Sequence, residues 1–585
     1  MPDTTLPGLL FMQRDGGLIV TPTQPTTDSV LIIGTAVDGP VNTPYNANNF
    51  SGAQALFGPL IFAQGYVNPQ TGVSDGASSH NSLMKAMHEA LLGGAGNIQL
   101  CRVGGNISTL NIGGTGALGL QFNGYYPGNI YNGNAGNGQS IAITQAGQMT
   151  TITVVQPTIK GSTLTYQFPN VNSTLLLVAN TINNDNLNGT VKVSLSSSSY
   201  NLPASGLTPA VGYMTGGSNG TDAPGDDLFS SKAAYYNNLT DSGTYNLLGT
   251  SSGSGTFASL QDAEFDLCVL AGIYGDDQVD NTTSTSVAVP FVQFLYNVSK
   301  QTYPCHGVLG LRPTNLSSVT DLTAFVNANY LGSTTGSIVL NGAVDTYQRW
   351  NKFGPIMSAG FTISDPDLGN TVDAGRYLSV VAGPDCILAH KDLGLYTENG
   401  AAVYAGLISS LPHKDAATQS PLGSVSSLLG NFSYNIRKFL TAGVGYKALT
   451  NTPGKGAYVT FHNSIDAGRP IVTQDVTVAA RNSDYKYLQI YRITSIAQHL
   501  VRAAVLPFIG KGMDPASKNS MNASIKSALD QLADAGALLG GQGIGYNFSL
   551  SWDAVQQAAG TVVVELQLRP SQQLRFIEVT VAVSN

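Results

Sequence analysis

Residues 103–184 contain a single charged side chain, Lys160. The stretch is rich in Gly, Asn, Thr, Ser and Ile, and segments such as 140–144 and 150–155 are typical of short strands separated by Gly/Asn turns. A charge-free, turn-rich stretch of this length inside a longer chain predicts an inserted β-rich module, which we place at residues 105–225.

The composition excludes several classes of protein. Among 585 residues, 42% are apolar and only 11% are charged, so charge-driven disorder is excluded. The 67 glycines have no period of three, which excludes collagen. The sequence also lacks a run of about 18 apolar residues, so no membrane span is predicted. Residues 1–17 lack the pattern of a secretory signal. The four cysteines fit no CxxC pattern, so we expect buried, reduced thiols and a cytoplasmic setting.

Charge is divided unevenly along the chain. Residues 1–435 have a balance of −13, whereas residues 436–585 have a balance of +5. Such a division indicates different partners for the two parts. The basic residues of 436–526 are spaced about ten apart without interleaved aromatic residues, which argues against nucleic acid. An acidic protein surface and an ordinary solvated surface both remain open.

Apolar periodicity predicts an alternation of strands and helices. Two βαβ units are expected, one from 29–36, 83–92 and 97–103, the other from 264–270, 289–301 and 307–311. A helix over 317–328, a strand over 377–382 and a helix over 400–410 follow.

The last part of the chain is the most regular. A long helix is predicted over 485–505, and Pro507 ends it. Asp514 is a candidate N-cap, with Pro515 at the first position of a second helix that runs to about Asp534. Strands are predicted over 561–568 and 576–583.

Several catalytic patterns occur without the context that their chemistry needs. A GxGxxG run at 114–119 lacks the preceding strand, the following helix and the acidic residue of a dinucleotide site. Ser74 lies in a GxSxG run that follows turn residues, not a strand. Neither Gly-Lys pair, at Lys455 or Lys511, is followed by Ser or Thr, so no P-loop is present. We therefore expect no catalytic residue, no metal and no cofactor, although the carboxylates of Asp276, Asp277 and Asp280 could bind a hard cation.

Short segments in a fixed order resemble the contractile-tail sheath proteins of bacteriophages, the myovirus-type tail sheath family. The similar segments are 30–44 (VLIIGTAVDGPVNTP), 55–59 (ALFGP), 84–103, 126–132 (YPGNIYN), 174–186, 215–220 (TGGSNG), 400–410, 439–446 (FLTAGVGY), 490–509 and 561–583. The resemblance spans nearly the whole chain and is strongest over 29–103 and 440–585. It departs from the family pattern over 104–225 and in the Gly/Ser-rich stretch 240–256.

The resemblance implies a multidomain α/β and α+β fold with extended N- and C-terminal arms. The implied layout has a core domain from both chain ends, with these boundaries: arm 1–28, core 29–104, inserted outer domain 105–225, middle α/β domain 226–435, core 436–570 and arm 571–585. The arms would add strands to a sheet of an adjacent subunit. The expected arm-strand residues are Gly17, Leu18, Ile19, Val20, Phe576, Ile577, Val579, Val581 and Val583.

The implied function is mechanical. Subunits of the family stack as hexameric rings around a tail tube, meet baseplate and tail-terminator proteins at the ends, and contract to drive the tube through a host envelope. The particle would assemble in the host bacterial cytoplasm as a virion tail, without binding nucleic acid directly or inserting into a membrane. The charge division favours contact between the basic region and an acidic tube, with Lys511, Lys518 and Lys526 as candidates.

Three alternatives stay open. The first is the sheath of a bacterial contractile injection system or pyocin-like particle, which shares the mechanism. The second is an α/β hydrolase built around Ser74. The third is a nucleic-acid-binding shell protein that uses the basic C-terminal part, which a filter-binding assay at two salt concentrations would reveal.

Overall fold

The computed structural model describes most of the chain between residues 28 and 573. The described ranges are 28–47, 49–60, 81–104, 107–112, 119–126, 131–134, 137–156, 163–216, 255–275, 287–301, 303–311, 338–340, 343–345, 362–365, 370–391, 393–442, 458–479, 483–540 and 542–573. The predicted arm strands, Ser74, the acidic group at 276–280 and the helix over 317–328 lie outside these ranges. In the part that the structure describes, no helix has the length and hydropathy needed to span a bilayer.

One mixed sheet forms the centre of the body. Its strands, in spatial order, are β2 (Tyr45–Ala47), β3 (Asn97–Arg102), β1 (Ser29–Gly34), β13 (Leu267–Leu270), β14 (His306–Gly310), β19 (Leu378–Gly383), β23 (Tyr458–Ser464) and β24 (Arg469–Val472). The inner strands are parallel, and β2 and β24 are antiparallel at the two edges. Every residue of β1 is buried, as expected for an apolar strand covered on both faces.

Both predicted βαβ units are confirmed. Helix α2 (Ser82–Gly93) connects β1 to β3, and α6 (Ala288–Gln301) connects β13 to β14. The two crossovers run in opposite directions along the sheet, so right-handed connections put α2 and α6 on opposite faces. This one sheet combines strands from the predicted core ranges with strands from the predicted middle domain. The expected domain boundaries at 225/226 and 435/436 therefore do not divide the strands into separate sheets.

Helix α9 (Ala401–Ser410) packs closely against α2. A Cβ atom on Gly406 would lie 2.1 Å from the Ala90 carbonyl oxygen, and one on Gly93 would lie 2.1 Å from the Val403 carbonyl oxygen. Glycine is therefore required on both helices where they cross. The four cysteines are free and buried, as expected from their spacing.

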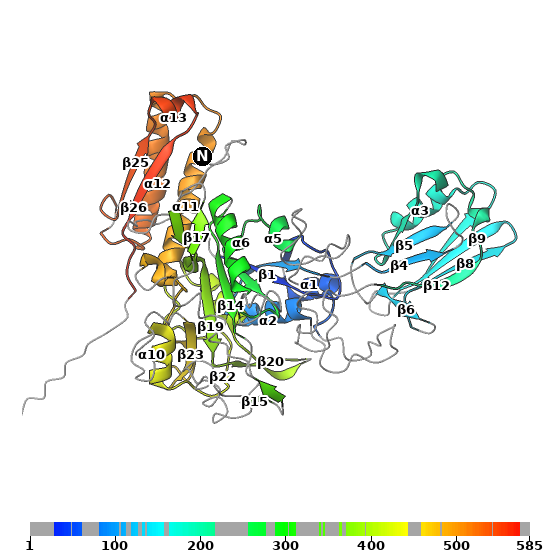
Figure 1. Cartoon of the computed structure of the whole chain (residues 1–585), viewed down its shortest axis with the longest axis horizontal. Coiled ribbons are helices and arrows are strands. Elements are labelled where there is room, and N and C mark those ends of the chain that lie inside the picture. The colour runs from blue at the N-terminus through cyan, green and yellow to red at the C-terminus, as the bar shows by residue number, and fades with distance from the viewer. Residues whose placement is uncertain are drawn as a thin grey trace, which may run out of the picture.

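Residues 107–216 form a module with its own hydrophobic core. One sheet contains β10 (Leu164–Pro169), β9 (Met149–Val155), β8 (Ser140–Ala146) and β12 (Ala210–Tyr213), and the other contains β11 (Val191–Ser194), β5 (Leu120–Gly124) and β4 (Thr109–Ile112). Helix α3 (Leu175–Asn183) completes this core. Figure 1 shows the module at one end of the molecule, away from the central sheet.

The C-terminal lobe lies at the other end of the molecule (Figure 1). It contains α11 (Leu488–Val505), α12 (Pro515–Asp534) and the hairpin of β25 (Tyr546–Ser551) and β26 (Val563–Leu568), with α13 (Ala554–Ala558) in the turn. Asp514 caps α12 as predicted. Helix α11 begins three residues later than predicted, because Tyr487 is extended and residues Asp484–Lys486 form a separate 3-10 turn.

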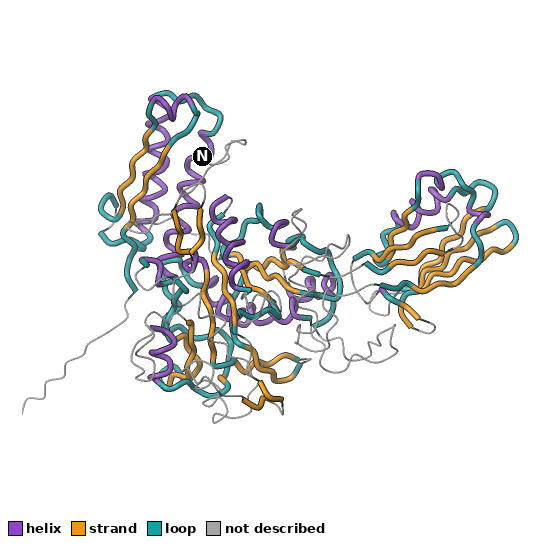
Figure 2. Tube along the Cα trace, in the orientation of Figure 1, coloured by secondary structure: helices purple, strands orange, loops and turns teal. Residues whose placement is uncertain are grey.

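The remaining elements are short. They are α1 (Phe50–Phe57), α5 (Thr256–Ser259), α10 (Tyr434–Ala442) and the strands β6 (Gly133–Asn134), β7 (Asn137–Gly138), β15 (Ile338–Leu340), β16 (Ala343–Asp345), β17 (Thr362–Asp365), β18 (Asn370–Asp373), β20 (Cys386–His390), β21 (Gly394–Glu398) and β22 (Ser427–Leu428). Figure 2 distinguishes the helices, strands and loops of the described residues along the chain.

Candidate assembly site at the two chain ends

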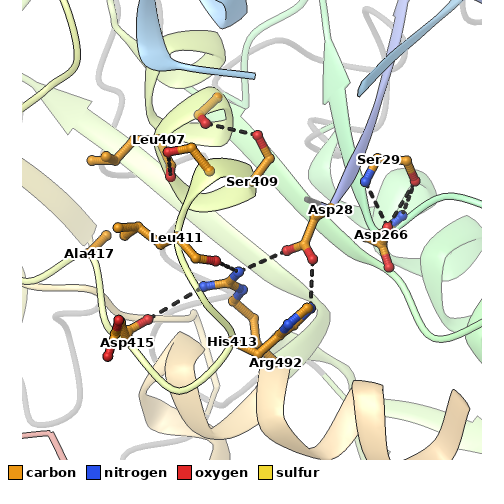
Figure 3. A network of polar contacts seen from close by, with 12 residues as sticks. Asp28, Ser29, Asp266, Leu407, Ser409, Leu411, His413, Asp415, Ala417 and Arg492 are labelled. Atoms are coloured by element: carbon orange, nitrogen blue, oxygen red, sulfur yellow. Dashed lines mark hydrogen bonds and ion pairs between the residues drawn. The ribbon is translucent and has the colours of Figure 1, made fainter. Parts of the chain in front are cut away.

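The N-terminal end of the described chain is fixed by a buried carboxylate. Asp28, which precedes β1, is only 2% exposed. Its Oδ2 accepts a hydrogen bond of 2.9 Å from Arg492 Nη2, and its Oδ1 lies 2.6 Å from His413 Nε2 (Figure 3). The Asp28 backbone N–H donates to the Ser409 carbonyl. Residues from three distant parts of the sequence therefore hold the point where the chain enters the sheet.

Arg492 also holds the loop that follows α9. Its Nη2 donates to the Leu411 carbonyl at 2.7 Å, and its Nη1 donates to the Asp415 carbonyl at 3.4 Å (Figure 3). Gln489, one turn earlier on α11, donates to the Lys414 carbonyl. A guanidinium offers several donors in a rigid plane, so one buried side chain can join an ion pair to two carbonyls.

A second carboxylate, that of the half-buried Asp266, lies near Asp28. Asp266 Oδ2 accepts from the Ser29 backbone N–H at 2.7 Å and from the Ser29 hydroxyl at 2.9 Å. Burial would raise the pKa of Asp28, but the positive charge of Arg492 and the contact with His413 hold that pKa below its ordinary value. Burial and the neighbouring Asp28 raise the pKa of Asp266. Arg492 thus stabilises the charged form of Asp28 in particular.

The C-terminal end is fixed by backbone and side-chain bonds. The Ser571 N–H donates to the Ala537 carbonyl at 2.6 Å, and Pro570 forms a bridge with Leu538. Gln573, the last described residue, accepts a hydrogen bond of 2.8 Å from the Thr418 hydroxyl. The chain beyond each end is where the sequence predicts an arm.

Asp475 holds the part of the loop that includes Thr418. Its backbone N–H donates to Thr418 Oγ1 at 3.0 Å, and its Oδ2 accepts from the Ala417 N–H at 3.2 Å. The Tyr404 hydroxyl donates to the other carboxylate oxygen. Burial raises the pKa of Asp475, which is 1% exposed. The loop is therefore fixed from α11 on one side and from Asp475 on the other.

The hairpin of β25 and β26 has unpaired edges within the described ranges. The two strands pair only with each other there. Tyr546, Phe548 and Leu566 turn toward the main core, and the Tyr546 hydroxyl donates to Asp530 of α12. A two-stranded sheet is marginally stable alone, and its free N–H and C=O groups can pair with another strand.

The three predicted tube-facing lysines lie on or beside α12. Lys518 stands over the Trp552 ring with its Nζ 5.0 Å from the centroid, and Lys511 stands over Phe508 at 4.9 Å. Lys526 Nζ lies 2.6 Å from Asp530 Oδ2, and its side chain is 61% exposed. The three lysines therefore lie on one lobe.

The contacts of Asp28 with His413 and Arg492 were not predicted from the sequence. Asp28 and Arg492 are 464 positions apart, and no local pattern in the sequence connects them. The ring centroids of His88 and His390, which are also far apart in the sequence, lie 4.6 Å from each other. No group of three or more His, Cys, Asp or Glu side chains suited to a metal ion occurs among the described residues.

No family model matches the sequence, and no curated protein matches it. In structure, the chain is similar to the sheath tail protein from Listeria innocua, with 10% identity and a TM-score of 0.52 over 94% of this chain and 93% of that one. It is also similar to the sheath tail protein from Desulfitobacterium hafniense (12% identity, TM-score 0.45, 94% and 100% covered). The helical sheath of the anti-feeding prophage in its contracted state matches with 10% identity and a TM-score of 0.43, with 99% of each chain covered.

The likeness to the Listeria protein defines a class of fold. This chain has the fold of a sheath tail protein, a mixed α/β architecture that extends over nearly the whole of both chains. The resemblance found in the sequence is confirmed for the fold.

Proposed function

We propose that the chain is a structural subunit of a contractile tail sheath. The observation that supports this most directly is the fold, which is shared with a sheath tail protein over 94% of this chain. Such a subunit has a mechanical role, not an enzymatic one. The subunit would assemble with copies of itself into a helical cylinder of stacked rings that surrounds a tube, meets a baseplate and a tail terminator at its ends, and shortens.

The two chain ends are the proposed links between subunits. Residues 17–20 and 576–583 would each add a strand to a neighbouring copy. The edges of β25 and β26, which pair with no other strand among the described residues, are suitable acceptors. A linked neighbour pulls on the end that it holds. The buried bonds of Asp28 and the bonds of residues 570–573 support the proposal, because a link that transmits force needs a firm attachment.

Removing both ends tests this proposal. A chain reduced to residues 28–573 should fold with the same circular dichroism spectrum but form no cylinders in negative-stain micrographs, whereas the full chain forms them. Chains that lack one end each serve as controls for the contribution of either arm. Cylinders that assemble and shorten normally from residues 28–573 would contradict the proposal.

The owner of the sheath is a finer proposal. We favour a bacteriophage tail that ejects a genome, and an injection system is the alternative. A capsid gene beside the sheath gene would distinguish the two.

We also propose that the module over 107–216 lies outermost, which its separate hydrophobic core supports. The basic C-terminal part would face the tube, which the lysines on and beside α12 support.

A further inference from the structure

One loop contacts both anchored ends of the chain. His413 and the carbonyls bound by Arg492 connect residues 411–415 to Asp28, and Thr418 connects the same loop to Gln573. We propose that residues 411–418, here called the coupling loop, link the two anchors so that a disturbance at one end reaches the other. Thr418 is the positioning residue of this link.

Hydrogen bonds hold most residues of the coupling loop. Arg492 fixes the carbonyls of Leu411 and Asp415, and Gln489 fixes the carbonyl of Lys414. Asp475 fixes Ala417 and Thr418 through two hydrogen bonds. A short segment fixed by many bonds cannot shift at one position without straining its neighbours.

The bonds at the N-terminal end make the link sensitive to displacement. If Asp28 moves, Arg492 loses its buried counter-charge while it still holds two loop carbonyls. A buried charge without its partner is costly, so Arg492 and the loop would rearrange together. The rearrangement reaches Thr418, whose hydroxyl both accepts from Asp475 and donates to Gln573.

In the assembled sheath, this link would pass tension from one arm to the other within a subunit, which rests on the proposed function. The coupling itself is a property of the single chain. If the two anchors were independent of each other, the structure would show the same contacts. A substitution at one anchor that changes the other anchor therefore distinguishes coupled anchors from independent ones.

Hydrogen–deuterium exchange of the full-length chain, in its unassembled fraction, provides that measurement. Thr418→Val removes the hydroxyl with little change in shape. It should speed exchange at residues 569–573 and, at the far end, raise by at least about threefold the exchange rate of the Asp28 and Ser29 amides. Conversely, His413→Gln should speed exchange at Asp28 and, by a similar factor, at residues 569–573.

Ser420→Ala is the matched control. Among the described residues its hydroxyl makes one long contact, of 3.5 Å, with the nearby Ala416 carbonyl. Exchange at both ends should stay as in the parent chain. The inference is overturned if each variant changes only its own end, or if Ser420→Ala acts like Thr418→Val. None of these readouts needs sheath formation, so failure of the cylinders to depend on the arms leaves this test intact.

Discussion

Arg492 stabilises the buried Asp28 cluster by combining an ion pair with hydrogen bonds to the backbone. Its side chain is 4% exposed, and it meets one carboxylate and two backbone carbonyls. Breaking a buried ion pair by removing one partner typically costs about 3–5 kcal/mol, because the other charge stays buried. Arg492 is therefore important for folding stability as well as for anchoring the chain end.

Replacing Arg492 by Met should lower the free energy of unfolding by about 3 kcal/mol or more, because Asp28 loses its counter-charge. Denaturant titration of the full chain measures this change. Arg502→Met, on the last turn of the same helix, should cost less than about 1 kcal/mol. If both variants lose the same free energy of unfolding, the ion pair of Asp28 with Arg492 stabilises the fold no more than Arg502 does.

His306 begins β14 and is 1% exposed. Its Nε2 lies 2.9 Å from the Ser379 hydroxyl, and burial lowers the pKa of its imidazole to about 3. An unfolded histidine has a pKa of about 6.5. Between these two values the unfolded chain binds a proton that the folded chain does not, so stability is lost as the pH falls through this window.

His306→Gln should remove part of this pH dependence. From pH 7 to pH 5 the histidine should reduce the stability of the parent chain by about 2 kcal/mol, a loss that the variant lacks. The comparison requires unfolding curves of both proteins at both pH values. Parallel losses in the two proteins would contradict a neutral, buried His306.

Helices were the elements that local signals predicted best. The run from Asp514 through Pro515 to Asp534 contains its own start and stop signals, and α12 has those bounds. The hairpin pattern of β25 was harder to see, because Asn547, Ser549 and Ser551 alternate with larger residues over only one strand length. Local chemistry sets where an element begins, whereas packing decides whether it forms.

The lysines of α12, the half-buried Lys518 and the exposed Lys526, give a prediction at the same scale. Lys518→Glu with Lys526→Glu should slow sheath growth on purified tubes at low ionic strength, and the difference from the parent should shrink in high salt. Light scattering follows the growth. Lys192→Glu, on β11 of the outer module, is the control. A salt-independent defect, or one equal to that of the control, would refute the tube-facing placement.

At the scale of the whole molecule, the sequence predicted the two βαβ units but not their union in one sheet. Strand β1 pairs with β13, more than 230 residues later. Apolar strands of this kind are interchangeable in pattern, so nothing local specifies the partner. The Asp28 site was unpredictable for the same reason, since three of its members come from segments that only the tertiary fold brings together.

The outer module should be dispensable for assembly. Its two connections lie side by side, because Thr109 and Thr215 exchange backbone hydrogen bonds of 2.8 and 3.1 Å. Replacing residues 110–214 by a short Gly/Ser loop should therefore leave a folded chain that still forms cylinders, as judged by negative stain. A folded deletion variant that stays monomeric would place the module in the subunit contacts.

The adjacency of Thr109 and Thr215 has an evolutionary consequence. Recombination that exchanges the intervening gene segment needs to match this junction and the buried hydrogen bond from Tyr131 to Asp38, since the inserted part otherwise brings its own apolar interior. Lineages can thus acquire a new appendage in one genetic event while the rest of the chain is inherited unchanged.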